Sequence, residues 1–265
     1  MKRVKWFVTA VAMGTLLFGC KAKEQTAETP PPEQPKAAAT AAPKAEPPAA
    51  VAAQPEATAS APAPAPRSGY DRALLRAALL KDKAPDTFQV KFTTTRGDFV
   101  VTVHRAWAPI GADRFYNLVK HHFYDNASFF RVVPAFIVQF GISAYPPVSA
   151  AWEKADIQDE PVTQSNKRGY VTYAKTSMPN TRSTQIFINL ADNAGLDRQG
   201  FSPFGVVDAQ GMKVVDMLYD QYASNSGPDQ DQISKLGKPY LDKGWPKLDS
   251  IKTATLIGLA AAKPQ

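Results

Sequence analysis

Short segments rich in apolar, β-branched and aromatic residues recur between residues 88 and 257 and are separated by turn-forming residues, which is typical of β-strands. The first two, residues 88–94 (FQVKFTT) and 98–104 (DFVVTVH), are joined by Arg96-Gly97. Glycine supplies the positive φ that a tight hairpin turn needs, so these two segments are expected to pair. The other predicted strands are residues 129–133, 136–140, 170–174, 185–190, 204–207 and 248–257.

Three further segments carry apolar residues at helical spacing and are predicted to be amphipathic helices. They are residues 70–82, stopped by Pro85, a segment opened by Pro109, and residues 211–219. The residues expected on the buried faces of the first two are Leu74, Leu75, Ala78, Leu79, Ala112, Phe115, Leu118 and Val119. Many short strands with two interrupting helices indicate a mainly β fold, a closed antiparallel eight-stranded β-barrel with two capping helices, because closure leaves no exposed edge. The helix over residues 70–82 is expected to dock on this barrel.

A long segment before the predicted domain has a different composition. Residues 21–66 contain 11 Pro and 17 Ala, and Val51 is their only large aliphatic residue. Such a segment buries too little apolar surface to offset its ordering entropy, so we expect a disordered Ala/Pro-rich tether. Fully extended, it would span on the order of 140 Å. A spacer is the preferred interpretation, and a recognition tail for a proline-binding partner is the alternative.

The first 19 residues are typical of an export signal. Three basic residues precede an apolar run over residues 6–18, which is too short to span a bilayer. Residues 17–20 (LFGC) resemble the bacterial lipobox, in which the cysteine is acylated and becomes the new N-terminus. Lipidation of Cys20 would anchor the chain to a membrane. Lys21 after the cysteine favours the outer membrane, facing the periplasm, by resemblance to lipoprotein sorting.

The sequence therefore divides into four parts. Residues 1–19 are the predicted signal, 20–67 the lipidated cysteine with its linker, 68–86 an N-terminal helix, and 87–260 the folded domain.

Charge and cysteine content exclude several other classes of protein. The net charge of +7 falls to +4, which is 7 minus 3, if the basic N-terminus is cleaved, and no basic stripe suggests nucleic-acid binding. The single cysteine, Cys20, excludes a disulfide within the chain. His104, His121 and His122 lack a metal-binding spacing. We expect no metal and no cofactor apart from the lipid, and a monomer.

Four blocks in order carry a resemblance to one family. Residues 129–139 (FFRVVPAFIVQ) resemble the cyclophilin segment of Phe, any residue, Arg, Val, aliphatic, Pro, small, Phe, apolar, any residue and Gln. The remaining blocks are Ala174-Lys175 with Asn180 and residues 183–188, Gly195-Leu196-Asp197 with Phe204-Gly205, and the hairpin and helix formed by Gly97–Val103 and Pro109–Val119. The chain thus resembles the cyclophilin-type peptidyl-prolyl cis/trans isomerases over roughly residues 88–257.

The resemblance implies catalysis of X–Pro bond rotation, which needs no nucleophile and no proton transfer. The barrier of ~18–20 kcal/mol falls if a fixed donor favours the twisted amide over the planar one. Arg131 is the candidate donor, and Gln139, helped by Gln185, would hold the substrate backbone near the rotating carbonyl. The residues implied for the apolar slot and for pairing with the substrate backbone are Phe136, Ile137, Phe187, Leu196, Phe201, Ala174 and Lys175. Singly, each of these has a simpler interpretation as core or solvated surface.

Several positions depart from the family pattern. Ala194 and Gly195 stand where the family often has Trp, which removes a flat contact surface for cyclosporin. Phe201 stands near the position of a family His and makes the slot wall apolar. Ile137 replaces the usual Met and Lys175 the usual Asn. Other departures, Met178 and Arg182, fall in a remodelled loop expected to affect substrate preference.

Three functions remain open on the sequence. The first is an envelope-bound isomerase that assists the folding of secreted proteins, and the second is a non-catalytic module that holds proline-containing segments in the same groove. The third is a structural lipoprotein of the envelope. Residues 221–247 are predicted to be loop-like, and Asp229 and Asp231 within them could ligate calcium or simply belong to turns.

Overall fold

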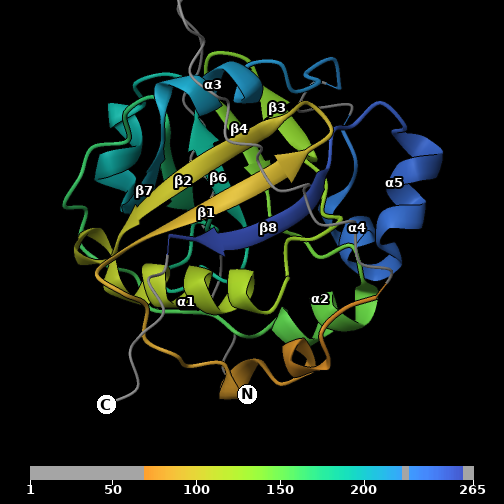
Figure 1. The fold of residues 1–265 in the computed structure, drawn as a ribbon, viewed down its shortest axis with the longest axis horizontal. Coiled ribbons are helices and arrows are strands. Elements are labelled where there is room, and N and C mark those ends of the chain that lie inside the picture. The colour runs from red at the N-terminus through yellow and green to blue at the C-terminus, as the bar shows by residue number, and fades with distance from the viewer. Residues whose placement is uncertain (1–68, 223–226, 259–265) are drawn as a thin grey trace, which may run out of the picture. The chain divides into compact units, whose positions relative to one another are not determined.

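Eight antiparallel strands form one sheet in the order β3-β4-β6-β5-β7-β2-β1-β8 in the computed structural model, which describes residues 69–222 and 227–258 (Figure 1). The predicted signal segment, Cys20 and the linker up to residue 67 lie outside the described residues. The strands are β1 Thr87–Thr94, β2 Asp98–His104, β3 Arg131–Val133, β4 Ile137–Phe140, β5 Tyr170–Tyr173, β6 Ile186–Asn189, β7 Pro203–Val207 and β8 Ile251–Ile257. All eight fall within or next to the segments predicted from the sequence.

The sheet curls into a half-barrel, so the prediction of a closed barrel is wrong. Its first and last strands, β3 and β8, share no ladder and meet only through an isolated bridge between Ser128 and Ser250. Two backbone hydrogen bonds flank this bridge, from Phe129 N to Asp249 O at 3.0 Å and from Ile251 N to Ala127 O at 2.8 Å. β3 contains only three residues, and its ladder is with β4 alone.

Two helices pack against the sheet as the sequence predicts. They are α1, Pro109–Lys120, and α3, Ala209–Val215, which lie at opposite ends of the sheet in Figure 1. Pro109 occupies the first turn of α1, where its missing N–H costs no helical hydrogen bond. The Asp208 side chain caps α3 by accepting from Gly211 N at 2.6 Å. Further helical segments are α2 Pro146–Trp152, α4 Gln230–Leu236, α5 Lys238–Gly244, η1 Arg72–Leu75, η2 Ala77–Leu79, η3 Arg105–Trp107 and η4 Ala194–Gln199.

The hydrophobic core is built largely from aromatic rings. Phe92 and Phe99 stack across β1 and β2 with ring centroids 4.9 Å apart, and the ring of Phe115 from α1 lies 6.3 Å from that of Phe92. Phe140 and Phe129 close the other side of this cluster, 5.0 Å from each other. Full burial of such a side chain contributes about 1.5–3 kcal/mol, so these rings are a main source of the domain's stability.

The predicted helix over residues 70–82 is replaced by the two short 3₁₀ turns η1 and η2. Only Leu74 of the expected apolar face is buried, while Leu75 and Leu79 are 40% and 68% exposed. The cause is tertiary hydrogen bonding. Trp152 Nε1 donates to the Leu74 carbonyl at 2.8 Å, so this carbonyl is bonded to α2 and not to the backbone of its own segment. These contacts outweigh the local helical propensity.

The prediction of a loop over residues 221–247 is also wrong, because the segment contains α4 and α5. Ile233 of α4 and Leu241 of α5 are buried against Phe130 and Ile142 in a small hydrophobic cluster separate from the main core. Within the described residues, none of these helices has the length and apolar character needed to cross a bilayer.

Candidate active site

The predicted site residues come together because three strands place them in register. Arg131 of β3 lies opposite Gln139 of β4, and Gln139 lies opposite Phe187 of β6. Directly paired residues point to the same face of a sheet, while their neighbours along each strand point to the other. Accordingly Val132 and Val138 belong to the main core, whereas Arg131, Gln139 and Phe187 form one row on the opposite face.

A chain of side-chain hydrogen bonds fixes this row. Nη1 of Arg131 donates to Oε1 of Gln139 at 3.1 Å, and Nε2 of Gln139 donates to Oε1 of Gln185 at 2.8 Å. Gln139 is only 7% exposed, so its amide is held in one orientation. Arg131 is half-buried and forms no ion pair with any residue that the structure describes. Its remaining N–H donors are therefore available to a ligand.

Apolar residues lie next to this chain of hydrogen bonds. Ile137 and Phe187 are 4% and 3% exposed, yet neither belongs to the main hydrophobic core. The ring of Phe201 meets that of Phe187 edge-on, with centroids 5.8 Å apart. Phe136 and Leu196 are half-buried. Ile137, Phe187 and Phe201 thus lie apart from the main core, beside the hydrogen-bonded row.

A tight turn presents Phe136. Ala135 has φ of +56°, and the Phe136 N–H donates back to the Val133 carbonyl at 3.0 Å. The Phe136 carbonyl accepts from Leu190 N at 2.8 Å and from Asn193 Nδ2 at 2.9 Å. Asn193 is a supporting residue that the sequence did not reveal, because it lies in an irregular loop without periodic pattern.

Lys175 joins two loops at the end of the site. Ala174 N donates to the Gln185 carbonyl at 2.9 Å, which holds this strand end beside Gln185. The Lys175 ammonium lies 3.1 Å from Oδ2 of Asp159 and 5.7 Å from the centroid of the Phe201 ring. Lys175 thus forms a cation–π contact with the residue that stands in place of the family histidine.

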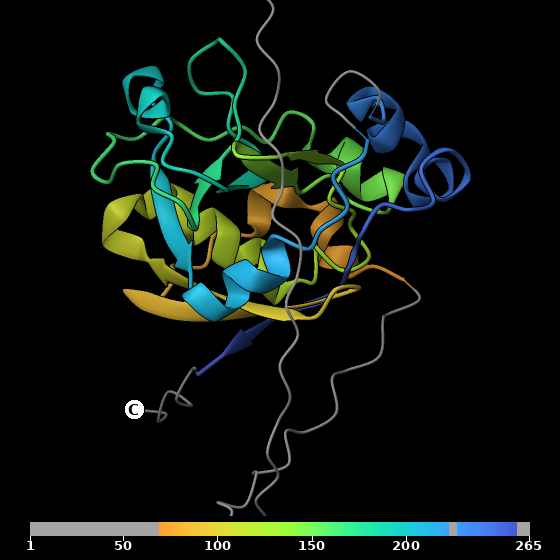
Figure 2. The same ribbon diagram turned by 90° about the horizontal axis from the view of Figure 1, so that it is seen from above.

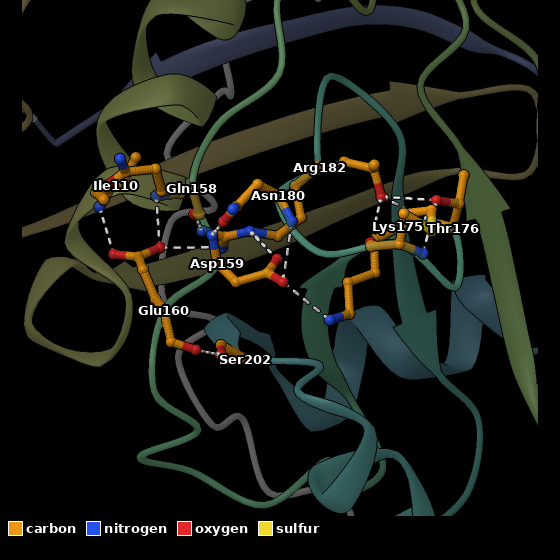
Figure 3. Close-up of polar contacts among 12 residues, drawn as sticks. Ile110, Gln158, Asp159, Glu160, Lys175, Thr176, Asn180, Arg182 and Ser202 are labelled. Atoms are coloured by element: carbon orange, nitrogen blue, oxygen red, sulfur yellow. Dashed lines mark hydrogen bonds and ion pairs between the residues drawn. The ribbon is translucent and has the colours of Figure 1, made fainter.

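Asp159 organises the loop that follows Lys175, as Figure 3 shows. Its carboxylate accepts from the Asn180 N–H at 3.1 Å as well as from Lys175, and its own N–H donates to Oδ1 of Asn180 at 2.7 Å. Burial raises the pKa of Asp159, but the Asn180 N–H and the Lys175 ammonium outweigh it and hold the pKa below the usual value. Asp159 is another residue absent from the sequence-based site.

Arg182 anchors the other end of the same loop, whose effect on substrate preference stays a prediction. It is 1% exposed and donates from Nη1 to Oε2 of Glu160 at 3.0 Å. Glu160 in turn accepts from Ile110 N at 2.6 Å and Gly111 N at 3.0 Å in the first turn of α1, where a carboxylate is favoured. A buried ion pair therefore ties the loop to α1 (Figure 3). Met178 remains on the surface, 64% exposed.

A cavity of about 810 Å³ lies beside Gln139. Of the predicted site residues, Gln139, Gln185, Ala174 and Lys175 line it. No group of three or more His, Cys, Asp or Glu side chains within the described ranges could hold a metal ion.

Residues 89–238 match the family model described as "Cyclophilin type peptidyl-prolyl cis-trans isomerase/CLD". The chain belongs to this family. It is 32% identical over 156 residues to peptidyl-prolyl cis-trans isomerase A of Dickeya dadantii, covering 57% of this chain and 82% of that protein. It is 34% identical over 146 residues to a peptidyl-prolyl cis-trans isomerase of Acinetobacter baylyi, covering 53% and 77%. A crystal structure of a Cryptosporidium parvum cyclophilin type isomerase superposes with a TM-score of 0.47 at 20% identity, covering 64% of this chain and 97% of that chain.

Membership of the cyclophilin-type family agrees with the resemblance inferred from four sequence blocks. The individual roles of Arg131, Gln139 and the slot residues stay predictions. The structure brings these residues together. Cys20, the predicted lipidation site, lies in the part of the chain that the structure does not describe.

Proposed function

We propose that this chain catalyses rotation about X–Pro bonds in exported polypeptides and so assists their folding. The observation that carries the proposal is the hydrogen-bonded chain Arg131–Gln139–Gln185 beside the apolar face of Ile137 and Phe187. It offers a fixed cationic donor next to a place for a pyrrolidine ring.

The chemistry follows from the amide bond. Rotation removes conjugation, and the prolyl nitrogen gains a lone pair that a donor can bind. Arg131 binds this lone pair only in the twisted state, so its interaction lowers the barrier instead of stabilising the ground state. The amide of Gln139, oriented by Gln185, contacts the substrate backbone near the rotating carbonyl. Phe136, Ile137, Phe187 and Leu196 enclose the ring.

The competing proposal is a binding module that holds proline-containing segments without rotating them. A module of this kind gains little from a donor aimed at the prolyl nitrogen. The half-buried Arg131, which has no carboxylate partner among the described residues, therefore favours catalysis.

Isomerisation by the chain is best measured by NMR exchange on a proline peptide, because this assay needs no protease. Uncatalysed exchange takes tens to hundreds of seconds, so catalysis is readily seen. Arg131→Ala should lower kcat/KM by roughly 10²-fold, the cost of losing one transition-state donor. Arg76→Ala, which removes an exposed arginine that forms no ion pair in the described part of the chain, should leave the rate unchanged. Peptide binding without exchange in the parent would support the binding module instead.

We further propose that the chain is an envelope lipoprotein, anchored by acylated Cys20 and held off the membrane by its Ala/Pro-rich tether. Support comes from the LFGC motif, the basic start and the composition of residues 21–66. An envelope scaffold without catalysis is the alternative, and it leaves the residues of the slot without a role.

A further inference from the structure

Residues 70–84 form a strap along one end of the domain, below α1 and α2 in Figure 1 and at the back of the view in Figure 2. Side chains of α1 hold the strap in place. Asn117 accepts from Asp82 N at 3.1 Å and donates to the Asp82 carbonyl at 2.7 Å. Asp113 accepts from Ala84 N at 2.8 Å. The strap is therefore part of the folded domain, and it presents its outer side chains without a separate folding step.

The 3₁₀ turns η1 and η2 determine which side chains of the strap face outward. A 3₁₀ turn repeats every three residues, so side chains three apart point the same way. Leu74, Ala77 and Leu80 accordingly face inward and pack in or against the main core. Leu75 and Leu79 fall between them and face solvent. Leu79, at 68%, is the most exposed large apolar side chain in the described part of the chain.

Exposed cations surround these two leucines. Four of them lie on the strap and form no ion pair with another described residue; they are Arg72, Arg76, Lys81 and Lys83. The carboxylates of the strap are both paired, Asp71 with His121 at 2.7 Å and Asp82 with Lys120 at 2.6 Å. With Lys120 included, five cations stand against two carboxylates, which leaves a net charge of +3 when His121 is neutral. The outer side of the strap thus combines positive charge with exposed leucines.

We propose that the strap is a membrane-contact surface, which lies on a bilayer that contains anionic phospholipids. The negative potential of such a bilayer attracts basic side chains, and exposed leucines enter the boundary between headgroups and acyl chains. The strap also follows directly on the predicted linker, so a chain held at a membrane through that linker would have a raised concentration of the strap at the lipid surface. The inference goes beyond the proposed catalysis, and it does not require acylation of Cys20.

A fluorophore at residue 79 tests the contact directly. Because Cys20 is the single cysteine, Cys20→Ser combined with Leu79→Cys gives the full chain one labelling site and removes the predicted lipidation site. The environment-sensitive dye NBD at this site should brighten several-fold and shift to the blue with vesicles of phosphatidylglycerol and phosphatidylcholine in equal parts. The response should be much weaker with phosphatidylcholine alone, and also in about 0.5 M NaCl, because salt screens exposed charges.

Met217→Cys in the same Cys20→Ser background is the control for position. Met217 is 54% exposed and follows α3, which lies at the opposite end of the sheet from α1 in Figure 1. Residues 1–19 are present in both samples, so binding of vesicles by the predicted signal segment alone would not distinguish the two labels. No response at residue 79, or an equal response at residue 217, overturns the inference.

Charge variants locate the contact on the strap. Lys81→Gln with Lys83→Gln should raise the lipid concentration needed for half of the response at residue 79, by about fivefold for each cation removed. Lys213→Gln with Lys243→Gln is the matched pair, because it removes two exposed lysines elsewhere and changes the net charge equally. This pair should leave the lipid concentration unchanged, and equal effects of the two pairs would refute a contact made by the strap. Neither measurement depends on isomerisation, so failure of the proposed catalysis would leave this test intact.

Discussion

Lys175 shows how one side chain can couple two loops of a binding site. Its ammonium contacts Asp159 on one loop and the Phe201 ring on another, and its side chain is only 12% exposed. Lys175 therefore links the two loops. Lys175→Met keeps the length of the side chain but loses the ion pair and the cation–π contact. We expect an increase in KM for proline peptides of several-fold with a smaller change in kcat, measured by NMR exchange over a range of peptide concentrations.

The Asp159 carboxylate gives a pH-dependent prediction at the same scale. Its folded-state pKa lies below the unfolded value, so the carboxylate stabilises the fold at neutral pH. This contribution is lost as the pH falls from the ordinary Asp range, around 3.9, through the lower folded pKa. Asp159→Asn should therefore destabilise the fold by about 1–2 kcal/mol at pH 7.

Urea unfolding of the parent and of Asp159→Asn at several pH values measures this difference. The gap in the free energy of unfolding should narrow below about pH 4. A difference in the free energy of unfolding that is constant with pH would mean that the substitution disturbs packing or hydrogen-bond geometry and does not act through the lost charge.

Arg131 and Arg182 illustrate which features of single residues can be predicted from the sequence and which cannot. Arg131, Gln139 and Gln185 could be predicted because the motif and the strand alternation both place them on one face. Arg182 could not, because its burial depends on Glu160, 22 residues away in a loop without periodicity. The sequence places Arg182 next to a site motif but does not reveal that its guanidinium is buried.

The helices and strands also divide into those that the sequence predicts and those that it does not. The long strands were predictable because apolar and polar residues alternate over four to eight residues, and α1 because its 12 residues are enough to show a helical period. The helices α2, α4 and α5 have seven residues each, and each stands among prolines or glycines that resemble turns in sequence. Residues 70–82 have the period but lack the helix, because the Leu74 carbonyl and the backbone of Asp82 bond to Trp152 and Asn117.

The junction of α4 and α5 gives a prediction about stability. Gly237 has φ of +66° and no room for a Cβ beside Pro146, so Gly237→Ala should destabilise the fold by at least about 1–3 kcal/mol. Gly244→Ala is the matched control, because a Cβ there meets no atom within 4 Å and alanine favours a helix. Urea unfolding of both variants measures the difference. Equal stabilities would show that α4 does not depend on this turn.

At the scale of the molecule, the proposed anchor and tether determine where the isomerase works. Radioactive palmitate supplied to cells that express the chain should label the parent and not Cys20→Ser, and the label should fractionate with the outer membrane. Unlabelled parent protein would contradict lipidation. Soluble Cys20→Ser protein that still catalyses exchange would show that anchoring is separate from catalysis.

The open side of the sheet places Arg131 on an edge strand, which has a second consequence. Because β3 is an edge strand that meets β8 only through the Ser128–Ser250 bridge, it presents backbone groups to which another chain could add. Short length, a charged residue and a following proline are features by which edge strands resist such addition, and β3 with Arg131 and Pro134 has all three. Arg131 and Pro134 thus give this edge two features that oppose the addition of another strand.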